Sequence, residues 1–261
     1  MDVTLSYAQL WAKVQACASE LSARFQVGDR IAVLSWNSPE YLTLIYAASK
    51  AHLVLVPLNT RLARAEWDYQ LTSTGASAVF LDEAFAEQFE YEDSHGSLAL
   101  VRLSQFCAAP SEMLGADSAM ARPIPTQNRE CGEARHELGE SVDVDVPVWI
   151  LHTSGSTGKP KGAILTHRSF LAGLESAEKG RPVVQGDGYL YPFPLFHVSA
   201  HNVFLQHKHG ACVYLLRSFD ADSVLNLCRS GKITSMSLAP TMLSMLVARP
   251  DFDYAVFDCV R

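Results

Sequence analysis

The sequence predicts an α/β fold built from mostly parallel sheets with helices on their flanks. Short apolar runs of strand length alternate with longer segments in which apolar residues recur every three or four positions. Over residues 31–81 this alternation gives strand, helix, strand, helix and strand, which is the pattern of consecutive βαβ units. The composition, with 48% hydrophobic and 19% charged residues, is typical of a globular chain.

The N-terminal part predicts a regular succession of elements. Apolar residues at helical spacing predict a first helix over 4–26, with Ser6 or Thr4 as its N-cap. A helix starting at Ser38-Pro39 is favoured because the hydroxyl can cap it and proline suits the first helical position. In order, the predicted elements after the first helix are a strand at 31–34, a helix to about 51, a strand at 53–56, a helix at 63–73 closed by Gly75, and a strand at 78–81.

The pattern weakens between residues 82 and 145. Residues 98–103 could form a strand, whereas the prolines and the polar run at 126–141 are typical of loop. We therefore divide the chain into a first sheet segment (1–81), an irregular connection (82–145) and a third segment (146–261). The elements predicted in the third segment are strands at 146–151 and 163–165, a helix at 167–177, an apolar stretch at 189–198, a strand at 211–215, a helix at 221–229, a strand at 233–238 and a helix at 241–248.

Charge and cysteine content exclude several classes of protein. The 21 basic residues are outnumbered by 28 acidic ones, so the net charge of −7 argues against non-specific nucleic-acid binding. Six widely spaced cysteines without a C-x-x-C motif favour reduced thiols. The N-terminus lacks the features of a signal peptide, and no apolar run approaches the 18 residues of a membrane span. We therefore expect a soluble, cytoplasmic protein.

One dense motif, HTSGSTGKPKG, occupies residues 152–162 between two predicted strands. Its small residues allow backbone N–H groups to turn inward, its hydroxyls add donors, and Lys159 and Lys161 add positive charge. Fixed donors and cations of this kind suit the β- and γ-phosphates of a nucleotide. The motif therefore predicts a phosphate-binding loop.

Two other readings of this motif fail. A Walker A loop requires glycine where Thr153 stands and a hydroxyl where Pro160 stands, and it would lead directly into a helix at 158–170. We predict strand, loop, strand and helix instead. Ser156 and Lys159 match the S-x-x-K of serine–lysine acyl-enzymes, but the companion motifs S-D-N and K-T-G do not occur.

A metal site is also disfavoured by the sequence. The histidines of the stretch are His197, His201, His207 and His209. No Asp or Glu lies between the first and the last of them, and H-E-x-x-H is absent. The sequence therefore leaves any metal ligands unknown.

Residues 153–162, followed by Thr166-His167, resemble the phosphate-loop signature of the adenylate-forming ligases, which include acyl-CoA synthetases. The resemblance extends over nearly the whole chain. Other strings similar to those of the family are Leu5–Leu10, Gly28–Val33, Asn37–Glu40, Val56–Asn59, Pro194–His197 and Ala239–Leu243. The resemblance implies the fold of the family's N-terminal domain, incomplete at its C-terminal side.

The resemblance also implies a reaction. A carboxylate attacks the α-phosphorus of Mg·ATP to give an acyl-adenylate and pyrophosphate, and a thiol, commonly coenzyme A, then takes the acyl group. His197 would lie beside the acyl and α-phosphate groups and gate the carboxylate pocket. The residues implied for the β- and γ-phosphates are Thr153, Ser154, Gly155, Ser156, Thr157 and Lys161, with Gly158 at the turn and Lys159 at the tip; those implied for the acyl site are Val198, Ser199, Asn202 and Val203.

Several segments that the family carries do not occur in these 261 residues: the Gly-Ala-Pro adenine loop, the Tyr-Gly-x-Thr-Glu string with its magnesium-binding Glu, the ribose-binding Thr-Gly-Asp and the C-terminal lid with its catalytic lysine. We therefore expect little or no adenylation activity from the chain alone, because an incomplete site cannot hold the reactants in line. An exposed sheet edge and an apolar patch are expected too, and both would allow self-association. The alternative function is a catalytically silent chain that binds a partner or a nucleotide phosphate.

Overall fold

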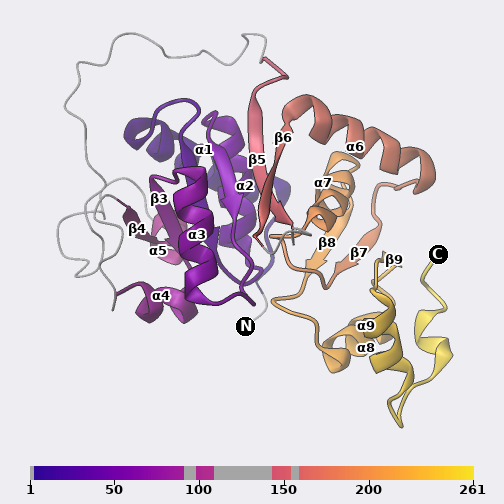
Figure 1. Ribbon diagram of the computed structural model, residues 1–261. Helices are drawn as coiled ribbons and strands as arrows, with labels where there is room; N and C mark the ends of the chain where they lie inside the picture. Colours follow the sequence, from indigo (N-terminus) through magenta and orange to yellow (C-terminus); the bar gives the residue numbers. More distant parts are fainter. Residues whose placement is uncertain (1–2, 91–97, 109–142, 154–158) are drawn as a thin grey trace. The chain divides into compact units, whose positions relative to one another are not determined.

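The computed structural model describes residues 3–90, 98–108, 143–153 and 159–261 (Figure 1). The chain divides into two compact units. The first comprises Met1–Ser35 and Pro39–Arg168, and the second comprises Trp36–Ser38 and Ser169–Arg261. The three segments drawn from the sequence do not follow this division, because residues 146–168 group with the first unit.

The described part of the first unit contains a six-stranded sheet in the order β4-β3-β1-β2-β5-β6. Its strands are β1 (Arg30–Leu34), β2 (Val54–Pro57), β3 (Ala78–Leu81), β4 (Ala99–Arg102), β5 (Pro147–Thr153) and β6 (Lys161–Thr166). All neighbouring strands are parallel except β5 and β6, which form an antiparallel pair at one edge. The prediction of a mostly parallel sheet is thus confirmed.

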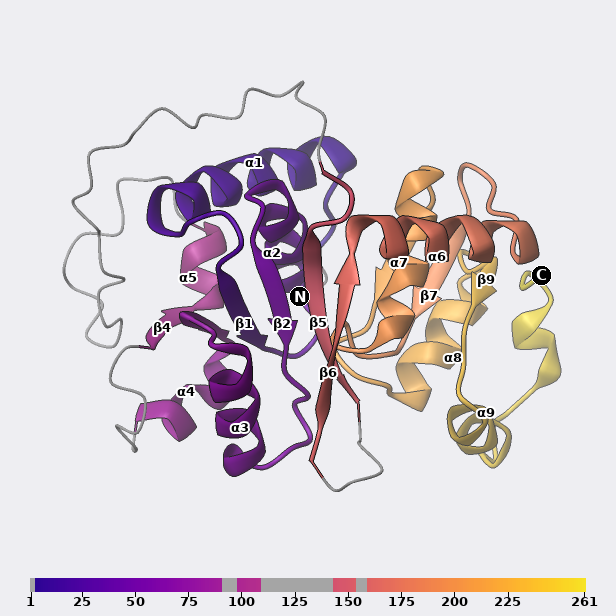
Figure 2. The same cartoon turned by 45° about the horizontal axis from the view of Figure 1, so that its top comes forward.

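Helices cover both faces of this sheet (Figure 2). They are α1 (Tyr7–Arg24), α2 (Pro39–Lys50), α3 (Arg64–Thr74), α4 (Glu83–Glu90) and α5 (Leu103–Ala108). Helices α1, α2 and α5 pack against one another. The chain moves from β1 to β2 in one direction and from β2 to β3 in the other, so right-handed crossovers place α2 and α3 on opposite faces.

Local signals set the ends of two predicted helices. Ser6 caps α1 by accepting a hydrogen bond from the backbone N–H of Gln9, whose side chain accepts one from the N–H of Ser6. Helix α3 ends at Gly75, which adopts the left-handed conformation with φ of 62°. Both assignments follow the sequence prediction.

The stretch predicted as an irregular connection contains regular structure. Within 83–108 the chain forms α4, β4 and α5, whereas only the strand at 98–103 was predicted. Helix α4 is only 8 residues long, and its Phe85 and Phe89 contact Trp67 of α3 at ring-centroid distances of 5.9 and 6.0 Å. Tertiary packing therefore stabilises a helix that is too short to be stable by itself. Residues 109–142 lie outside the described part.

The second unit is built on a parallel sheet whose described strands have the order β8-β7-β9. The strands are β7 (Gly188–Tyr191), β8 (Cys212–Leu215) and β9 (Ser235–Met236); the helices are α6 (His167–Gly180), α7 (His201–Lys208), α8 (Ala221–Arg229) and α9 (Pro240–Val247), with 3₁₀ turns η1 (Val198–Ala200) and η2 (Tyr254–Phe257). Helix α7 was missed by the sequence prediction, and β9 is shorter than the predicted strand.

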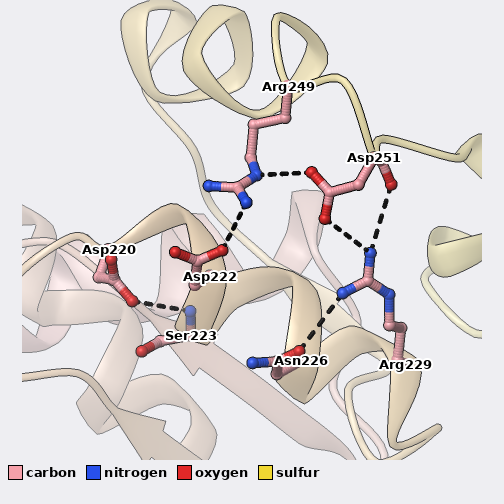
Figure 3. A network of polar contacts seen from close by, with 7 residues as sticks. All are labelled: Asp220, Asp222, Ser223, Asn226, Arg229, Arg249 and Asp251. Carbon is pink, nitrogen blue, oxygen red and sulfur yellow. Dashed lines mark hydrogen bonds and ion pairs between the residues drawn. The ribbon is translucent and has the colours of Figure 1, made fainter.

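An apolar cluster and a polar network hold α8 in place. The residues buried together are Leu190 of β7, Val224 and Leu225 of α8, Ile233 just before β9, and Leu246 of α9. On the surface, charged side chains of α8 meet those that follow α9 (Figure 3). The ion pairs of this network are Arg249–Asp222 at 2.7 Å, Arg249–Asp251 at 2.9 Å and Arg229–Asp251 at 3.5 Å. Because these pairs are partly solvated, we expect the apolar cluster to stabilise this region more.

Apolar side chains are exposed in both units, each taken by itself. Strand β6 lies at an edge of the first sheet, and its Ile164 is 62% exposed. On α9 of the second unit the exposed fractions of Leu243 and Met245 are 46% and 57%. Self-association through such surfaces stays a prediction. Among the residues described, no helix has the length and apolar character needed to cross a bilayer.

The close approach of β7 to the segment before β9 requires glycine at position 188. A Cβ atom at Gly188 would lie 1.8 Å from the carbonyl oxygen of Lys232, which is a backbone atom and cannot turn away. We predict that Gly188→Ala lowers the free energy of unfolding by about 3 kcal/mol. Gly180→Ala is the matched control, since a Cβ there meets nothing within 4 Å. Urea denaturation of both variants checks this, and equal midpoints would contradict it.

Candidate functional site

The predicted phosphate loop is closed at its base by an antiparallel strand pair. In the register of β5 and β6, Thr153 stands directly opposite Lys161. Directly opposite residues of such a pair project to the same face, with Cβ atoms about 5 Å apart. Both residues are exposed. The structure thus brings together two of the residues predicted from the sequence, one from each end of the loop.

The tip of this loop is described only in part. The predicted residues Ser154, Gly155, Ser156, Thr157 and Gly158 lie outside the described residues.

Lys159 is described, and its Nζ lies 5.8 Å from the ring centroid of Tyr69 on α3. This distance suits a cation–π contact. Tyr69 was not predicted as a neighbour of the loop, because nothing in its local sequence indicates where α3 packs.

On the opposite face of the hairpin, Gly162 lies beside two side chains of β5. A Cβ atom at Gly162 would lie 2.7 Å from Cγ2 of Ile150 and 3.4 Å from Nε2 of His152, so a side chain there would require these neighbours to shift. Burial lowers the pKa of His152, and its Nδ1 has no hydrogen-bond partner among the described residues. We therefore expect a neutral imidazole at the end of β5, immediately before the loop.

His197 lies in the second unit, where one nitrogen of its ring contacts a short series of hydrogen-bonded polar groups. Its Nδ1 is 3.2 Å from the backbone nitrogen of Ser199, which donates to it, and 3.1 Å from Ser199 Oγ. Ser199 Oγ in turn lies 3.0 Å from the hydroxyl of Tyr191 at the end of β7. The ring itself is exposed. Tyr191 was not predicted from the sequence.

The loop that carries His197 is fixed by the side chain of Asn37. Its Nδ2 donates to the carbonyls of Phe193 at 2.7 Å and Leu216 at 2.8 Å, and its Oδ1 accepts from the backbone N–H of Leu195 at 2.7 Å. Asn37 is only 5% exposed. All these groups belong to the second unit, so a residue far away in the sequence determines the conformation before His197.

The residues predicted for the acyl site have different environments. Val198 is 51% exposed, whereas Val203 on α7 is fully buried. Asn202 accepts a hydrogen bond from Arg181 at 3.0 Å. The predicted role of these residues, and of Ser199, stays a prediction.

The other histidines of this region have structural contacts. His201 stacks on Phe170 of α6 at a centroid distance of 4.1 Å, and its Nδ1 lies 2.9 Å from the carbonyl of Val198. His209 and Lys208 both pair with Glu178, at 2.7 and 2.6 Å. In the part of the chain that the structure describes, no group of three or more His, Cys, Asp or Glu residues is arranged to hold a metal ion.

The whole chain matches a known family. The profile of the AMP-binding enzyme family covers residues 1–259. The chain belongs to the AMP-binding enzyme family. The described order of β5, β6 and α6 agrees with the predicted strand, loop, strand and helix, whereas the Walker A alternative, with a loop leading directly into a helix, is wrong.

Relatives within the AMP-binding family include ligases of carboxylic acids. The chain is 32% identical over 262 residues to an indoleacetate–CoA ligase of Aromatoleum aromaticum, with 98% of this chain and 49% of that protein covered. It is 31% identical over 253 residues to the long-chain-fatty-acid–CoA ligase FadD13 of Mycobacterium tuberculosis, with 96% of this chain and 47% of that protein covered. The chain therefore spans about half the length of these curated relatives.

Solved structures of the AMP-binding family share the fold. The N-terminal domain of FACL13 from Mycobacterium tuberculosis matches with a TM-score of 0.78 at 29% identity, over 96% of this chain and 60% of that one. The o-succinylbenzoate coenzyme A synthetase MenE of Bacillus subtilis, solved with ATP and magnesium, matches with a TM-score of 0.76 at 25% identity, over 95% of this chain and 61% of that one. The predicted fold class is confirmed.

The hydrogen bonds of Asn37 give a first prediction for this region. Asn37→Ala would take the hydrogen bond of Asn37 away from two part-buried carbonyls and one buried N–H, so we expect the free energy of unfolding to fall by about 3 kcal/mol. The matched control is Asn226→Ala, because Asn226 is exposed in the same unit and accepts one bond from Arg229 at 3.3 Å. Denaturant unfolding checks both variants. If Asn37→Ala lowered the free energy of unfolding by less than the control variant does, Asn37 would not be the residue that fixes the loop.

His207 predicts that the stability of the fold depends on pH. Burial lowers its pKa from the ordinary 6.5 to about 4. The unfolded chain therefore binds more protons than the folded chain between these values, so stability is fully present above pH 6.5 and falls as the pH falls toward 4. The full shift corresponds to about 3 kcal/mol. We predict that His207→Gln flattens the slope of the free energy of unfolding between pH 7 and 4.5. An unchanged slope would contradict this.

Proposed function

We propose that this chain takes part in the ATP-dependent activation of a small-molecule carboxylic acid. The acid would form an acyl-adenylate with release of pyrophosphate, and the thiol of coenzyme A would then take the acyl group with release of AMP. The observation that carries the proposal is the pairing of Thr153 with Lys161 across the base of the loop. Membership of the AMP-binding enzyme family supports it.

Thr153 and Lys161 offer the chemistry that a polyphosphate needs. The hydroxyl donates a directional hydrogen bond, and the ammonium group is a compact positive charge with three donors. Both are exposed on one face of a paired hairpin, so the backbone holds the two side chains next to each other before an anion arrives. In this proposal, residues 154–158 add further donors from the loop itself.

ATP and Mg²⁺ are the co-reactants in this proposal, and MenE, solved with both, supports it. Lys161 fits phosphate oxygens rather than a metal, since a protonated ammonium group has no lone pair, and the hydroxyl of Thr153 can donate to the same oxygens. Mg²⁺ would neutralise phosphate charge while bound to the nucleotide. We assign none of the described residues to it.

We propose that the carboxylic acid binds to the second unit. His197 is exposed at the end of a loop that Asn37 fixes, so its ring is available to an anionic oxygen. The relatives named above act on indoleacetate and on long-chain fatty acids. We propose a carboxylic acid as the substrate class without choosing among such acids, and a cytoplasmic location, in line with the widely spaced cysteines.

The test compares nucleotides that differ in the phosphates they carry. We predict that Lys161→Ala weakens the binding of ATP to the chain about tenfold or more, because a charge-assisted hydrogen bond to a phosphate is lost. Binding of AMP, which lacks the β- and γ-phosphates, should change little. Isothermal titration calorimetry in the presence of Mg²⁺ measures both.

The controls separate local from general effects. Lys161→Arg retains the charge and should retain part of the affinity. Lys179→Ala removes an exposed lysine on α6 and should leave binding unchanged. Equal ATP affinity of Lys161→Ala and the unsubstituted chain would refute the proposed role of the loop. Robust ATP–pyrophosphate exchange by the chain alone would exclude the alternative of a silent binding protein.

A further inference from the structure

Three side chains of the second unit form a continuous hydrogen-bonded chain around Ser199. Tyr191 Oη lies 3.1 Å from the carbonyl oxygen of Pro194, to which it can donate, and 3.0 Å from Ser199 Oγ. Ser199 Oγ lies 3.1 Å from His197 Nδ1. The backbone N–H of Ser199 also donates to this Nδ1, at 3.2 Å. Tyr191 and Ser199 each have one hydroxyl proton to share among these acceptors.

Two arrangements of the protons link all three side chains, and only the second also uses the contact of Tyr191 with the carbonyl of Pro194. In the first, Tyr191 donates to Ser199, Ser199 donates to His197 Nδ1, and the ring carries its proton on Nε2. In the second, His197 carries its proton on Nδ1 and donates to Ser199, Ser199 donates to Tyr191, and Tyr191 donates to Pro194. Each arrangement runs in a single direction, so its hydrogen bonds strengthen one another.

The backbone N–H of Ser199 favours the first arrangement, in which the Ser199 hydroxyl is a second donor to Nδ1. A hydroxyl proton can rotate to another acceptor, but a backbone N–H is fixed. A proton on Nδ1 would therefore face this N–H at 3.2 Å, and two donors would compete for the same space. The first arrangement avoids this conflict.

Tyr191 can act as the donor at the start of this chain because it keeps its proton. Its side chain is buried, and this burial raises the pKa of the hydroxyl well above the ordinary value. Within the residues that the structure describes, Nε2 of His197 has no hydrogen-bond partner, and the ring is exposed.

We propose that Ser199 and Tyr191 are positioning residues that hold His197 as the tautomer with its proton on Nε2, so that the ring presents an N–H donor to an anionic oxygen of a ligand. The role for a ligand rests on the proposed function above, whereas the tautomer rests on the geometry alone. The ligand class is a carboxylate or a phosphate ester, since both offer oxygen acceptors and no proton at neutral pH.

The experiment measures ¹⁵N chemical shifts of the ring nitrogens in the histidine-labelled chain, at a pH where the ring is neutral. His197→Ala identifies the signals. We expect Nδ1 to have the shift of an acceptor nitrogen and Nε2 that of an N–H donor. Ser199→Ala should lower the ratio of the Nε2–H to the Nδ1–H tautomer about 2- to 10-fold, which is the loss of one neutral hydrogen bond. Ser199→Thr keeps the hydroxyl and should restore the ratio.

Tyr191→Phe tests the start of the chain and should shift the ratio in the same direction by a smaller factor, about twofold. Its matched control is Tyr189→Phe. Tyr189 lies two residues earlier on the same strand, but its hydroxyl bonds Ser237 at 2.9 Å rather than Ser199. If Tyr191→Phe does not fold, the pair Ser199→Ala and Ser199→Thr decides.

A dominant Nδ1–H tautomer in the unsubstituted chain, or an equal ratio in Ser199→Ala, would overturn the proposal. These results do not depend on nucleotide binding. Failure of ATP to bind would reject the proposed function and leave the tautomer assignment standing, so the two failures are distinguishable.

Discussion

The antiparallel pairing of β5 with β6 is the constraint on which the candidate phosphate site depends. Every other neighbouring pair in this sheet is parallel and therefore needs a long crossover, whereas an antiparallel pair needs only a short connection. Thr153 and Lys161 can face each other across a seven-residue gap only because the chain reverses here. A shift of one residue in this register would turn one of them to the opposite face.

In the second unit, hydrogen bonds from neighbouring groups fix the position of an exposed ring, that of His197. His197 lies on a loop, and loops tend to be mobile unless their backbone groups are bound. Asn37 binds the carbonyl of Phe193 and the N–H of Leu195 on one side, and Ser199 binds the ring on the other. The backbone before His197 and the Nδ1 side of its ring are thus both held by hydrogen bonds, while the ring remains exposed to solvent.

The sequence predicted those features that depend on local chemistry. Ser6 and Gly75 set helix ends because capping needs only a few neighbouring residues. The motif at 152–162 was recognisable because small residues and lysines are dense there. The resemblance to adenylate-forming ligases then supplied His197, which no local pattern would have singled out.

The features that the sequence could not predict depend on distant contacts. The partners of Asn37 lie 156 to 179 residues away, and a lone asparagine before a helix gives no sign of them. Tyr191 looked like an ordinary strand residue, because its hydroxyl contacts follow from the fold of η1. Helix α4 was missed because it is short, and the contacts of Phe85 and Phe89 with Trp67 that stabilise it follow from the fold.

The assignment of Trp36–Ser38 to the second unit has a practical consequence for dissecting the protein. The backbone passes between the units three times, after Ser35, after Ser38 and after Arg168. Expressing only the residues after the last of these positions would give a C-terminal fragment without this tripeptide. The fragment would then lack the hydrogen bonds by which the tripeptide stabilises one of its loops. Fusing that tripeptide through a linker to residues 169–261 is one way to study this half in isolation.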